Sequence, residues 1–354
     1  MGNFEVMAKQ AKTASDEDPV LGELPAGFPW TTTDPFLFGA HQKDFYPAGN
    51  RDMGPATDSG RRPAGEEFST GGWSMYYGKT VPGFPRHPHR GFEIITFLTK
   101  GTIDHSDSVG ATGRYGAGDV QWLTAGRGIE HAELYPLLDE RAPNTIELFQ
   151  IWLNLPASEK MVDPYFTMLW RENLPRAVLK DDAGRSTEVV AVAGRFADLE
   201  PPPAPRDSWA SNSESDVAIW QFLAESSAAW TLPPTASPQT VRTLYVYEGT
   251  VELGGKAFAG PIGLVLRSDR LVEVTAGPNG AAAVVLQGRP IAEPVVMGGA
   301  FVMNDQREIQ EAYRDHRNGR FGSWLWRGDA PVHPRSAGRF ATHPDGTTEF
   351  PEAV

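Results

Sequence analysis

Short apolar segments separated by glycine-bearing turns dominate this chain. Residues 34–46, 94–98, 120–123 and 146–155 are rich in β-branched and aromatic side chains, which favour strands over helices. The same pattern continues in the second half of the chain, at residues 188–193, 217–223, 243–248, 262–266 and 282–287. The pattern predicts an all-β protein.

One segment near the C-terminus has a helical pattern instead. Residues 304–316 place apolar or aromatic side chains at i, i+3, i+4 and i+7, namely Ile309, Ala312, Tyr313 and His316. Asn304 is the predicted N-cap, and Asn318-Gly319 is the predicted stop. We therefore expect a short C-terminal helix.

A weak internal repeat relates the two halves of the chain. Residues 95–103 (ITFLTKGTI) resemble residues 243–251 (TLYVYEGTV), each an apolar strand that turns at Gly-Thr into another strand. The repeat indicates two copies of one β-barrel unit. The second copy has SPQTVR (237–242) where the first has HPHR (87–90), so its metal ligands are predicted to be lost.

Charge and composition narrow the range of functions. The chain has 32 Lys and Arg against 45 Asp and Glu, a formal net charge of -13, which disfavours binding to the phosphates of nucleic acids. It has 0 Cys, which removes disulfides and thiol catalysis. No apolar run is long enough to span a membrane. We expect a cytoplasmic protein with neither nucleic acid nor membrane as a partner.

Two pairs of potential metal ligands form the strongest candidate functional site in the sequence. His87 and His89 stand two residues apart, so on an extended strand both side chains point to one face. His131 and Glu133 repeat that spacing after the turn at residues 124–128. An isolated His-x-His pair is more often structural. If the two segments face each other, however, three imidazoles and one carboxylate converge, a donor set that suits a divalent transition metal.

These segments resemble the pirin family of bicupins. The resemblance covers residues 34–322 and rests on HPHRGFE (87–93), GDVQWLTAGRGIEHAE (118–133), LFQIWLNLPASEKMVDP (148–164) and GAFVMN (299–304). It implies two stacked antiparallel β-barrels, the first holding one metal, usually Fe(II), with Mn, Ni, Cu, Co or Zn as alternatives. The implied ligands are His87, His89, His131 and Glu133.

The domains follow from the repeat and the resemblance. We predict a flexible N-terminal arm (1–30), a metal-binding cupin domain (31–178), a second cupin domain without ligands (179–303) and a C-terminal helix with an extension (304–354). Residues 47–67 form a predicted surface loop. That loop and the extension could lie over the cavity mouth or at a subunit interface.

Further candidates are weighed against structural roles. Glu93 is interpreted as a catalytic or cavity-lining acid beside the metal, or equally as a structural partner of Arg90 or a backbone amide. His105 is expected to be hydrogen-bonded rather than a ligand. Four aromatic residues could form a substrate pocket or simply core: Phe92, Trp122, Phe149 and Trp152. No function is assigned to His41, His316, His333 and His343.

The resemblance implies two functions. Some pirins show quercetin 2,3-dioxygenase activity, which predicts ring-opening oxidation of a flavonol or another enolic aromatic by O2. Glu133 or Glu93 would then take the proton of the substrate hydroxyl. The alternative is an iron-dependent redox sensor that binds a protein partner without turnover, as the nuclear pirins of animals act as transcription coregulators.

Overall fold

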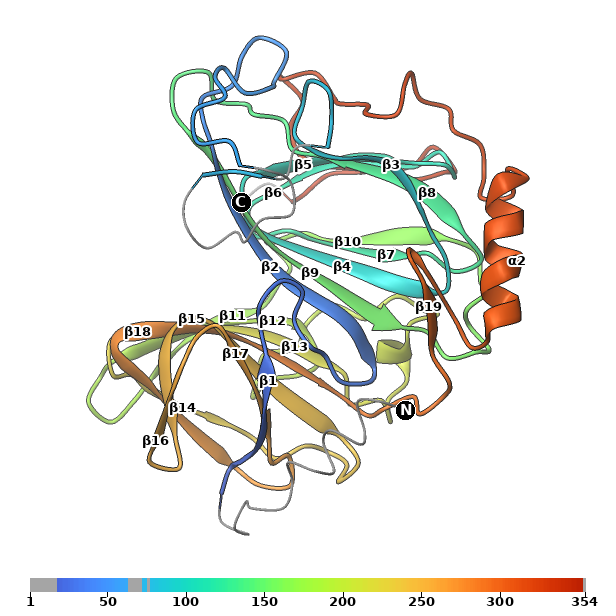
Figure 1. The fold of residues 1–354 in the computed structure, drawn as a ribbon. Helices are drawn as coiled ribbons and strands as arrows, with labels where there is room; N and C mark the ends of the chain where they lie inside the picture. The colour runs from blue at the N-terminus through green and yellow to red at the C-terminus, as the bar shows by residue number, and fades with distance from the viewer. Residues whose placement is uncertain (1–17, 63–71, 75–76, 353–354) are drawn as a thin grey trace. The chain divides into compact units, whose positions relative to one another are not determined.

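The computed structural model describes residues 18–62, 72–74 and 77–352 and forms two compact units (Figure 1). Among the described residues, the first unit consists of residues 18–39 and 173–292, and the second of those from 40 to 172 and from 293 to 352. The units therefore interleave along the chain, whereas the sequence predicted consecutive domains. The first unit contains the N-terminal segment because residues 20–25 pair with residues 262–266, a strand from the second half of the chain.

The predicted arm is wrong for the residues that form strand β1 (Val20–Pro25). This strand pairs antiparallel with β17 (Ile262–Leu266), and its even-numbered residues are more buried than its odd-numbered ones. Such period-2 burial is the normal pattern of a strand with one face on the core. The rest of the predicted arm up to residue 17 lies outside the described residues.

The first unit is built on one nine-stranded antiparallel sheet that bends around an apolar core. Its main path runs β1-β17-β15-β18-β13-β12-β11, with β14 paired to β18 and β16 to β15. The core includes Trp220, Phe222, Leu244 and Val285. The other strands are β11 (Arg176–Lys180), β12 (Ser186–Ala193), β13 (Ala218–Ala224), β14 (Ala229–Leu232), β15 (Val241–Leu253), β16 (Lys256–Ala259) and β18 (Val272–Gly288). A 3-10 turn, η2, covers Trp209–Ser211.

The second unit contains a five-stranded and a six-stranded sheet that face each other (Figure 1). The five-stranded sheet has the order β10-β7-β4-β9-β2, with β2 (Phe36–Tyr46), β4 (Phe92–Lys100), β7 (Val120–Thr124), β9 (Asn144–Asn154) and β10 (Tyr165–Leu169). The other sheet has the order β22-β21-β6-β5-β8-β3, with β3 (Gly83–His89), β5 (Thr102–Asp107), β6 (Thr112–Gly116), β8 (Ile129–Leu134), β21 (Phe340–Thr342) and β22 (Thr348–Glu349). A separate pair joins β19 (Val296–Gly298) to β20 (Phe301–Met303). Within the described part of the chain, the prediction of an all-β protein with one short helix is confirmed.

The internal repeat has a structural counterpart. In the second unit, β4 ends at Lys100, and the φ of 92° at Gly101 turns the chain into β5. In the first unit, Gly249 has a φ of 80° at the matching place, and the register of β15 against β18 shifts there without ending the strand. Positive φ values are cheap only for glycine, which explains why both copies carry it at this turn.

Helix α2 (Gln306–Arg317) confirms the predicted helix, with a corrected cap. Asp305, rather than Asn304, is the N-cap, because its carboxylate accepts from the backbone N–H of Glu308 and the Glu308 side chain reaches back in a capping box. The helix ends at Arg317, with Asn318 as its C-cap and Gly319 following with a φ of 69°, at the predicted stop. No helix in the described part of the chain is long and apolar enough to cross a membrane.

The C-terminal extension lies along the second unit and does not end at the helix. Its strand β21 adds to the edge of β6, and Trp324 and Val332 pack on the cluster formed by Met53, Val81, Ala132 and Leu134. The extension thereby covers the outer face of the sheet that contains β3 and β8. Residues 47–62 of the predicted loop contain neither strand nor helix, and residues 63–67 lie outside the described residues.

Candidate metal centre

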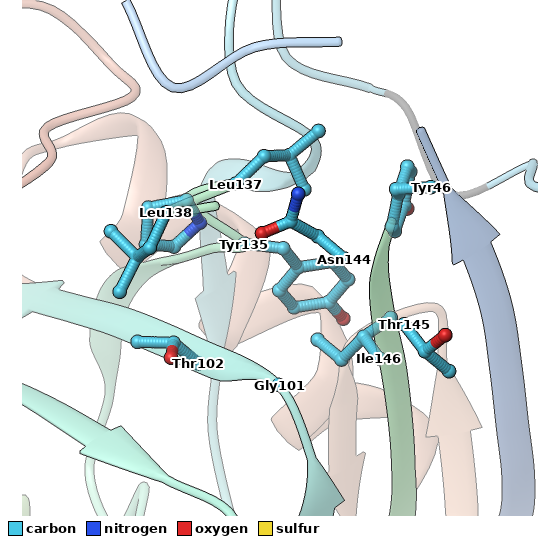
Figure 2. Close-up of a pocket in the computed structure, with 10 residues that line it drawn as sticks. Tyr46, Gly101, Thr102, Tyr135, Leu137, Leu138, Asn144, Thr145 and Ile146 are labelled. Atoms are coloured by element: carbon cyan, nitrogen blue, oxygen red, sulfur yellow. The ribbon is translucent and has the colours of Figure 1, made fainter. Parts of the chain in front are cut away.

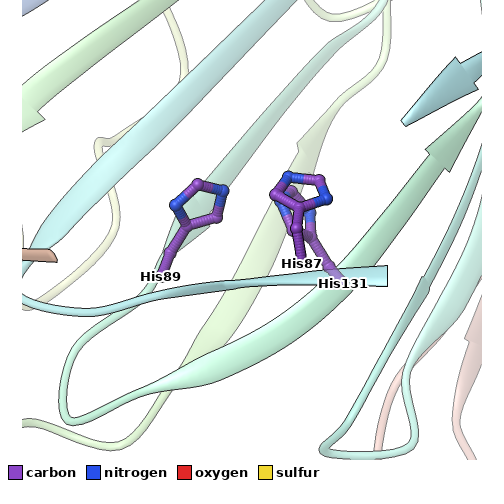
Figure 3. Close-up of side chains that lie close together, drawn as sticks. All are labelled: His87, His89 and His131. Atoms are coloured by element: carbon purple, nitrogen blue, oxygen red, sulfur yellow. The ribbon is translucent and has the colours of Figure 1, made fainter. Parts of the chain in front are cut away.

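Strands β3 and β8 bring the two ligand pairs together. They pair antiparallel, and His87 lies directly opposite His131 in the register. Because side chains alternate along a strand, His89 on β3 and Glu133 on β8 point to the same face as this pair. Figure 3 shows the three imidazoles on one side of β3. The predicted convergence of the histidines is confirmed.

The three histidines are close enough to share one ion. One ring nitrogen from each lies within 4.8 Å of the other two. Metal–ligand bonds of about 2.1 Å allow two donors of one ion to be at most about 4.2 Å apart. Small rotations of the imidazoles would therefore close the site around a cation. Both ring nitrogens of His131 are buried without a hydrogen-bond partner in the described structure, which also fits a metal ligand.

Glu133 is placed beside the histidines and is held from the opposite sheet. Its Oε2 lies 4.0 Å from His131 Nε2, within the span of two donors on one ion. Thr96 on β4 donates to Oε1 at 3.3 Å, and Gln150 on β9 donates to Oε2 at 3.3 Å. Thr96 and Gln150 are themselves opposite each other in the register of β4 and β9. Ligation by Glu133 remains a prediction that this geometry suits.

Burial keeps the histidines in the form that binds metals. Desolvation lowers the pKa of His89 and of His131 well below 6.5, and it also lowers the pKa of His87. All three are therefore neutral near pH 7. The Nδ1 of His87 lies 2.8 Å from the carbonyl oxygen of Pro85, so Nδ1–H donates there and Nε2 keeps its lone pair for a cation.

The turn after His89 is clamped from outside the barrel. Gly91 has a φ of 85°, and a Cβ built there would lie 2.0 Å from the carbonyl oxygen of Val302. Lys160, which is 1% exposed, donates to the carbonyl oxygens of Gly91 and Val302 and to Asn154 Oδ1. These bonds fix the path of the chain between the ligand strand β3 and the opposite sheet.

Glu93 does not point toward the histidines. It lies opposite Thr124 in the register of β4 and β7, and its Oε1 accepts from the Thr124 hydroxyl at 2.9 Å. On the same strand, Thr96 reaches Glu133, so the odd-numbered Glu93 belongs to the other face of the sheet. The prediction of a catalytic or cavity-lining Glu93 is therefore corrected. Because the turn at Gly91 separates β3 from β4, the residues that face the metal site are odd-numbered at His87 and His89 on β3 but even-numbered at Thr96 on β4.

The register also divides the four aromatic residues for which the sequence left two roles open, pocket wall or core. The ring centroids of Phe92 and Trp152 lie 5.4 Å and 5.8 Å from that of His89, so both rings line the metal site. Phe149 stacks on His41 at 4.9 Å, and Trp122 lies opposite Ile95, both on the other face of the sheet. Two of the four residues are thus wall residues, and two are core.

His105 has the predicted structural role. Its Nε2 lies 3.1 Å from Asp107 Oδ2, and both side chains are fully buried. His105 lies opposite Glu133 in the register of β5 and β8, with its ring centroid 5.5 Å from that of His131. Each of the four histidines without a predicted function makes a polar contact: His41 with Glu147, His316 with Glu130, His333 with Thr112 and His343 with Glu349.

Sequence reasoning missed the residues that hold Glu133. Thr96 and Gln150 sit in apolar strands, and a polar side chain in such a run was the only available signal. Phe84 was missed as well, because a register shift between Phe84 and His87 turns its ring toward the site. Only the pairing of the strands reveals these positions.

A small β-barrel with three neutral histidines and a carboxylate on its inner wall defines a metal-binding protein of the cupin class. Comparison with known proteins specifies the family. The Pirin family model matches residues 64–153, and the model of the Pirin C-terminal cupin domain matches residues 220–322. The chain belongs to the pirin family.

Individual relatives agree with this assignment. A Pseudomonas aeruginosa protein named "Putative quercetin 2,3-dioxygenase" is 37% identical over 68% of this chain and 79% of its own length. Human pirin is 33% identical over 68% of this chain and 78% of its own length. A crystal structure of quercetin 2,3-dioxygenase from Acinetobacter baumannii matches with a TM-score of 0.65 and 25% identity, covering 86% of this chain and 96% of that one.

Proposed function

We propose that this protein is a metal-dependent dioxygenase that opens the ring of a flavonol or a similar enolic aromatic with O2. The observation that carries the proposal is the cluster of His87, His89 and His131, of which the last two are buried, with Glu133 beside it and aromatic rings along its wall. The names of the Pseudomonas and Acinetobacter relatives support the same chemistry.

The three histidines and Glu133 would hold one divalent cation, with Fe(II) proposed first and Mn, Ni, Cu, Co or Zn as alternatives. Nitrogen donors with a single carboxylate suit these ions better than Mg²⁺ or Ca²⁺. When bound, the cation would lower the pKa of a coordinated enol, and a redox-active ion among these would also supply the redox chemistry that a reaction with dioxygen requires.

The residues around the ligands bind the substrate and protect it. Glu133, whose carboxylate Thr96 and Gln150 orient, would accept the enol proton. Phe92 is fully buried, and Trp152 is partly buried. Both rings would pack against an aromatic substrate ring and exclude water from it.

The direct test is turnover of quercetin by the iron-loaded protein under air. Loss of the visible absorbance of quercetin, matched by oxygen uptake, should occur with the wild type and disappear in His87→Ala and His131→Ala. Glu93→Gln serves as the matched control and should retain activity, because Glu93 lies on the other face of β4. Turnover that persists in both histidine variants would refute a reaction at this centre.

The alternative function predicts a different outcome. A metal-dependent protein-binding sensor would bind the cation through the same residues but would consume no flavonol or other enol with Fe, Mn, Ni or Cu. That result, obtained with protein shown by elemental analysis to contain metal, would favour the sensor.

A further inference from the structure

A defined cavity in the second unit is too small for a flavonol. Its volume is about 60 Å³, and its lining includes Tyr46, Tyr135, Leu137 and Asn144 (Figure 2). Sites for drug-sized ligands usually measure about 300–1,000 Å³. Tyr135 closes this cavity on one side and contacts Phe84 on the other, with ring centroids 6.3 Å apart. An extended aromatic substrate therefore does not fit in this cavity.

The metal centre is nearest to solvent at His87. Exposure is 0% for His131, 3% for Glu133 and 5% for His89, whereas His87 is only partly buried. A substrate that approaches from solvent would thus meet the edge of the site formed by His87.

Phe84 lies at this edge because of a strand irregularity. Phe84 and His87 are three residues apart, so regular alternation would put them on opposite faces of β3. The register with β8 shifts between them, and both rings turn to the same side, with centroids 6.1 Å apart. β-Bulges commonly re-aim side chains next to functional sites.

Tyr77 extends the aromatic surface from Phe84 toward solvent. Its ring stacks on that of Phe84 at 5.2 Å with an interplanar angle of 28°. Tyr77 is 47% exposed, and Phe84 is partly buried. Exposed tyrosines occur singly on many surfaces. Here the ring continues a line of contacts, Tyr77 to Phe84 to His87, that ends at a predicted metal ligand.

We propose that Phe84 and Tyr77 form the recognition platform for the distal ring of a planar, multi-ring aromatic enol whose hydroxyl and carbonyl reach the metal centre beside His87. This inference rests on the proposed function and specifies the substrate class. Stacking selects extended aromatic enols over small ones, since a small enol would reach the metal without touching the platform. Each aromatic contact typically stabilises a complex enough to change affinity about two- to tenfold.

Binding to the zinc-loaded protein tests the platform without turnover, because zinc has no redox chemistry. The dissociation constant of quercetin is measured by quenching of tryptophan fluorescence, and that of acetylacetone, a small enol, by calorimetry. Phe84→Leu and Tyr77→Ala should weaken quercetin binding about three- to tenfold and leave acetylacetone unchanged. Zinc content is checked after gel filtration, since quercetin itself binds metals.

Phe28→Leu is the matched control. Phe28 is a 41% exposed aromatic residue in the first unit that also contacts another phenylalanine, Phe38. Its substitution should change neither constant. Unchanged quercetin affinity in both platform variants, or equal weakening for both ligands, would overturn the platform.

The failure of the platform and the failure of the dioxygenase are distinguishable. If the iron-loaded wild type consumes quercetin while the platform variants keep its KM, the platform is wrong and the proposed function stands. If neither the wild type nor any variant consumes quercetin, but the dissociation constants of the zinc-loaded proteins change as expected, the platform stands and the proposed function fails.

Discussion

His87 and His131 lie directly opposite each other in the antiparallel pair of β3 and β8, with their ring centroids 4.4 Å apart. Directly opposed residues are the closest that two strands can provide, so this register brings two imidazoles together without a loop or a helix. Because the pair is part of a hydrogen-bonded sheet whose outer face the extension covers, the ligand positions are set before any cation binds.

Acid should remove the metal and weaken the metal-free fold. Burial lowers the pKa of His89 and of His131, so the folded chain keeps them neutral while the unfolded chain takes up protons below about pH 6.5. The unfolded state then binds more protons, and the free energy of unfolding decreases as the pH falls below 6.5. Metal content after dialysis and urea unfolding, each at pH 8 and pH 5, measure both effects. Full metal retention at pH 5 would argue against a histidine site.

Glu133→Gln should lower metal affinity on the order of tenfold or more, because the amide keeps the shape of the side chain but removes its negative charge. Glu93→Gln should leave the affinity unchanged, since its carboxylate faces Thr124 on the other side of the sheet. Competition with a chelator measures both affinities. An equal loss of metal affinity in the two variants would contradict the conclusion that Glu133 faces the metal site and Glu93 faces away from it.

Glu147→Gln should destabilise the protein in a pH-dependent way. Burial raises the pKa of Glu147, but hydrogen bonds from His41 and Lys100 outweigh it and hold the pKa at about 2, below its ordinary 4.5. The stabilisation is therefore present above pH 4.5 and is lost as the pH falls toward 2. Allowing for screening, we expect a loss of about 1–2 kcal/mol at pH 7 that shrinks at pH 3. Urea unfolding of both proteins at the two pH values tests this; a constant difference would refute it.

Arg339→Ala should loosen the C-terminal extension. The guanidinium lies 2.7 Å from Asp119 Oδ1 and 2.6 Å from Glu172 Oε1, and Asp119 is fully buried. Removing it leaves a buried carboxylate without its cation, at a cost of about 2 kcal/mol. Limited proteolysis should then cut the extension faster. Arg327→Ala, an exposed arginine of the same extension, is the control and should leave the cleavage rate unchanged.

The pattern of neighbouring residues was sufficient to predict several structural features, because those features depend only on residues close together in the chain. The spacing of His87 with His89 places two imidazoles on one strand face whatever lies around them. Helix α2 and its stop at Asn318-Gly319 were also predictable. The cap was assigned one residue too early, since both Asn304 and Asp305 are good caps and only the bond to Glu308 distinguishes them.

Strand register was not predictable, and it decided the identity of the wall residues. Glu93 and Phe149 fall on the outer face of the five-stranded sheet, whereas Thr96, Gln150 and Trp152 fall on the inner face. A shift of one residue would exchange these sets. The register depends on strands that are about 55 residues apart in the chain, so no local window contains it.

By itself, the amino-acid sequence determined that the chain is all-β, that it contains two related halves and that two ligand pairs suit a transition metal, because alternation and spacing are properties of neighbouring residues. Only the tertiary structure decided that Glu133 is held by Thr96 and Gln150, that Glu93 faces away, that Phe84 turns toward His87 and that β1 joins the second half of the chain. Those relations arise when distant strands pair and bury their apolar faces, and the free energy of that burial belongs to the whole fold rather than to any one segment.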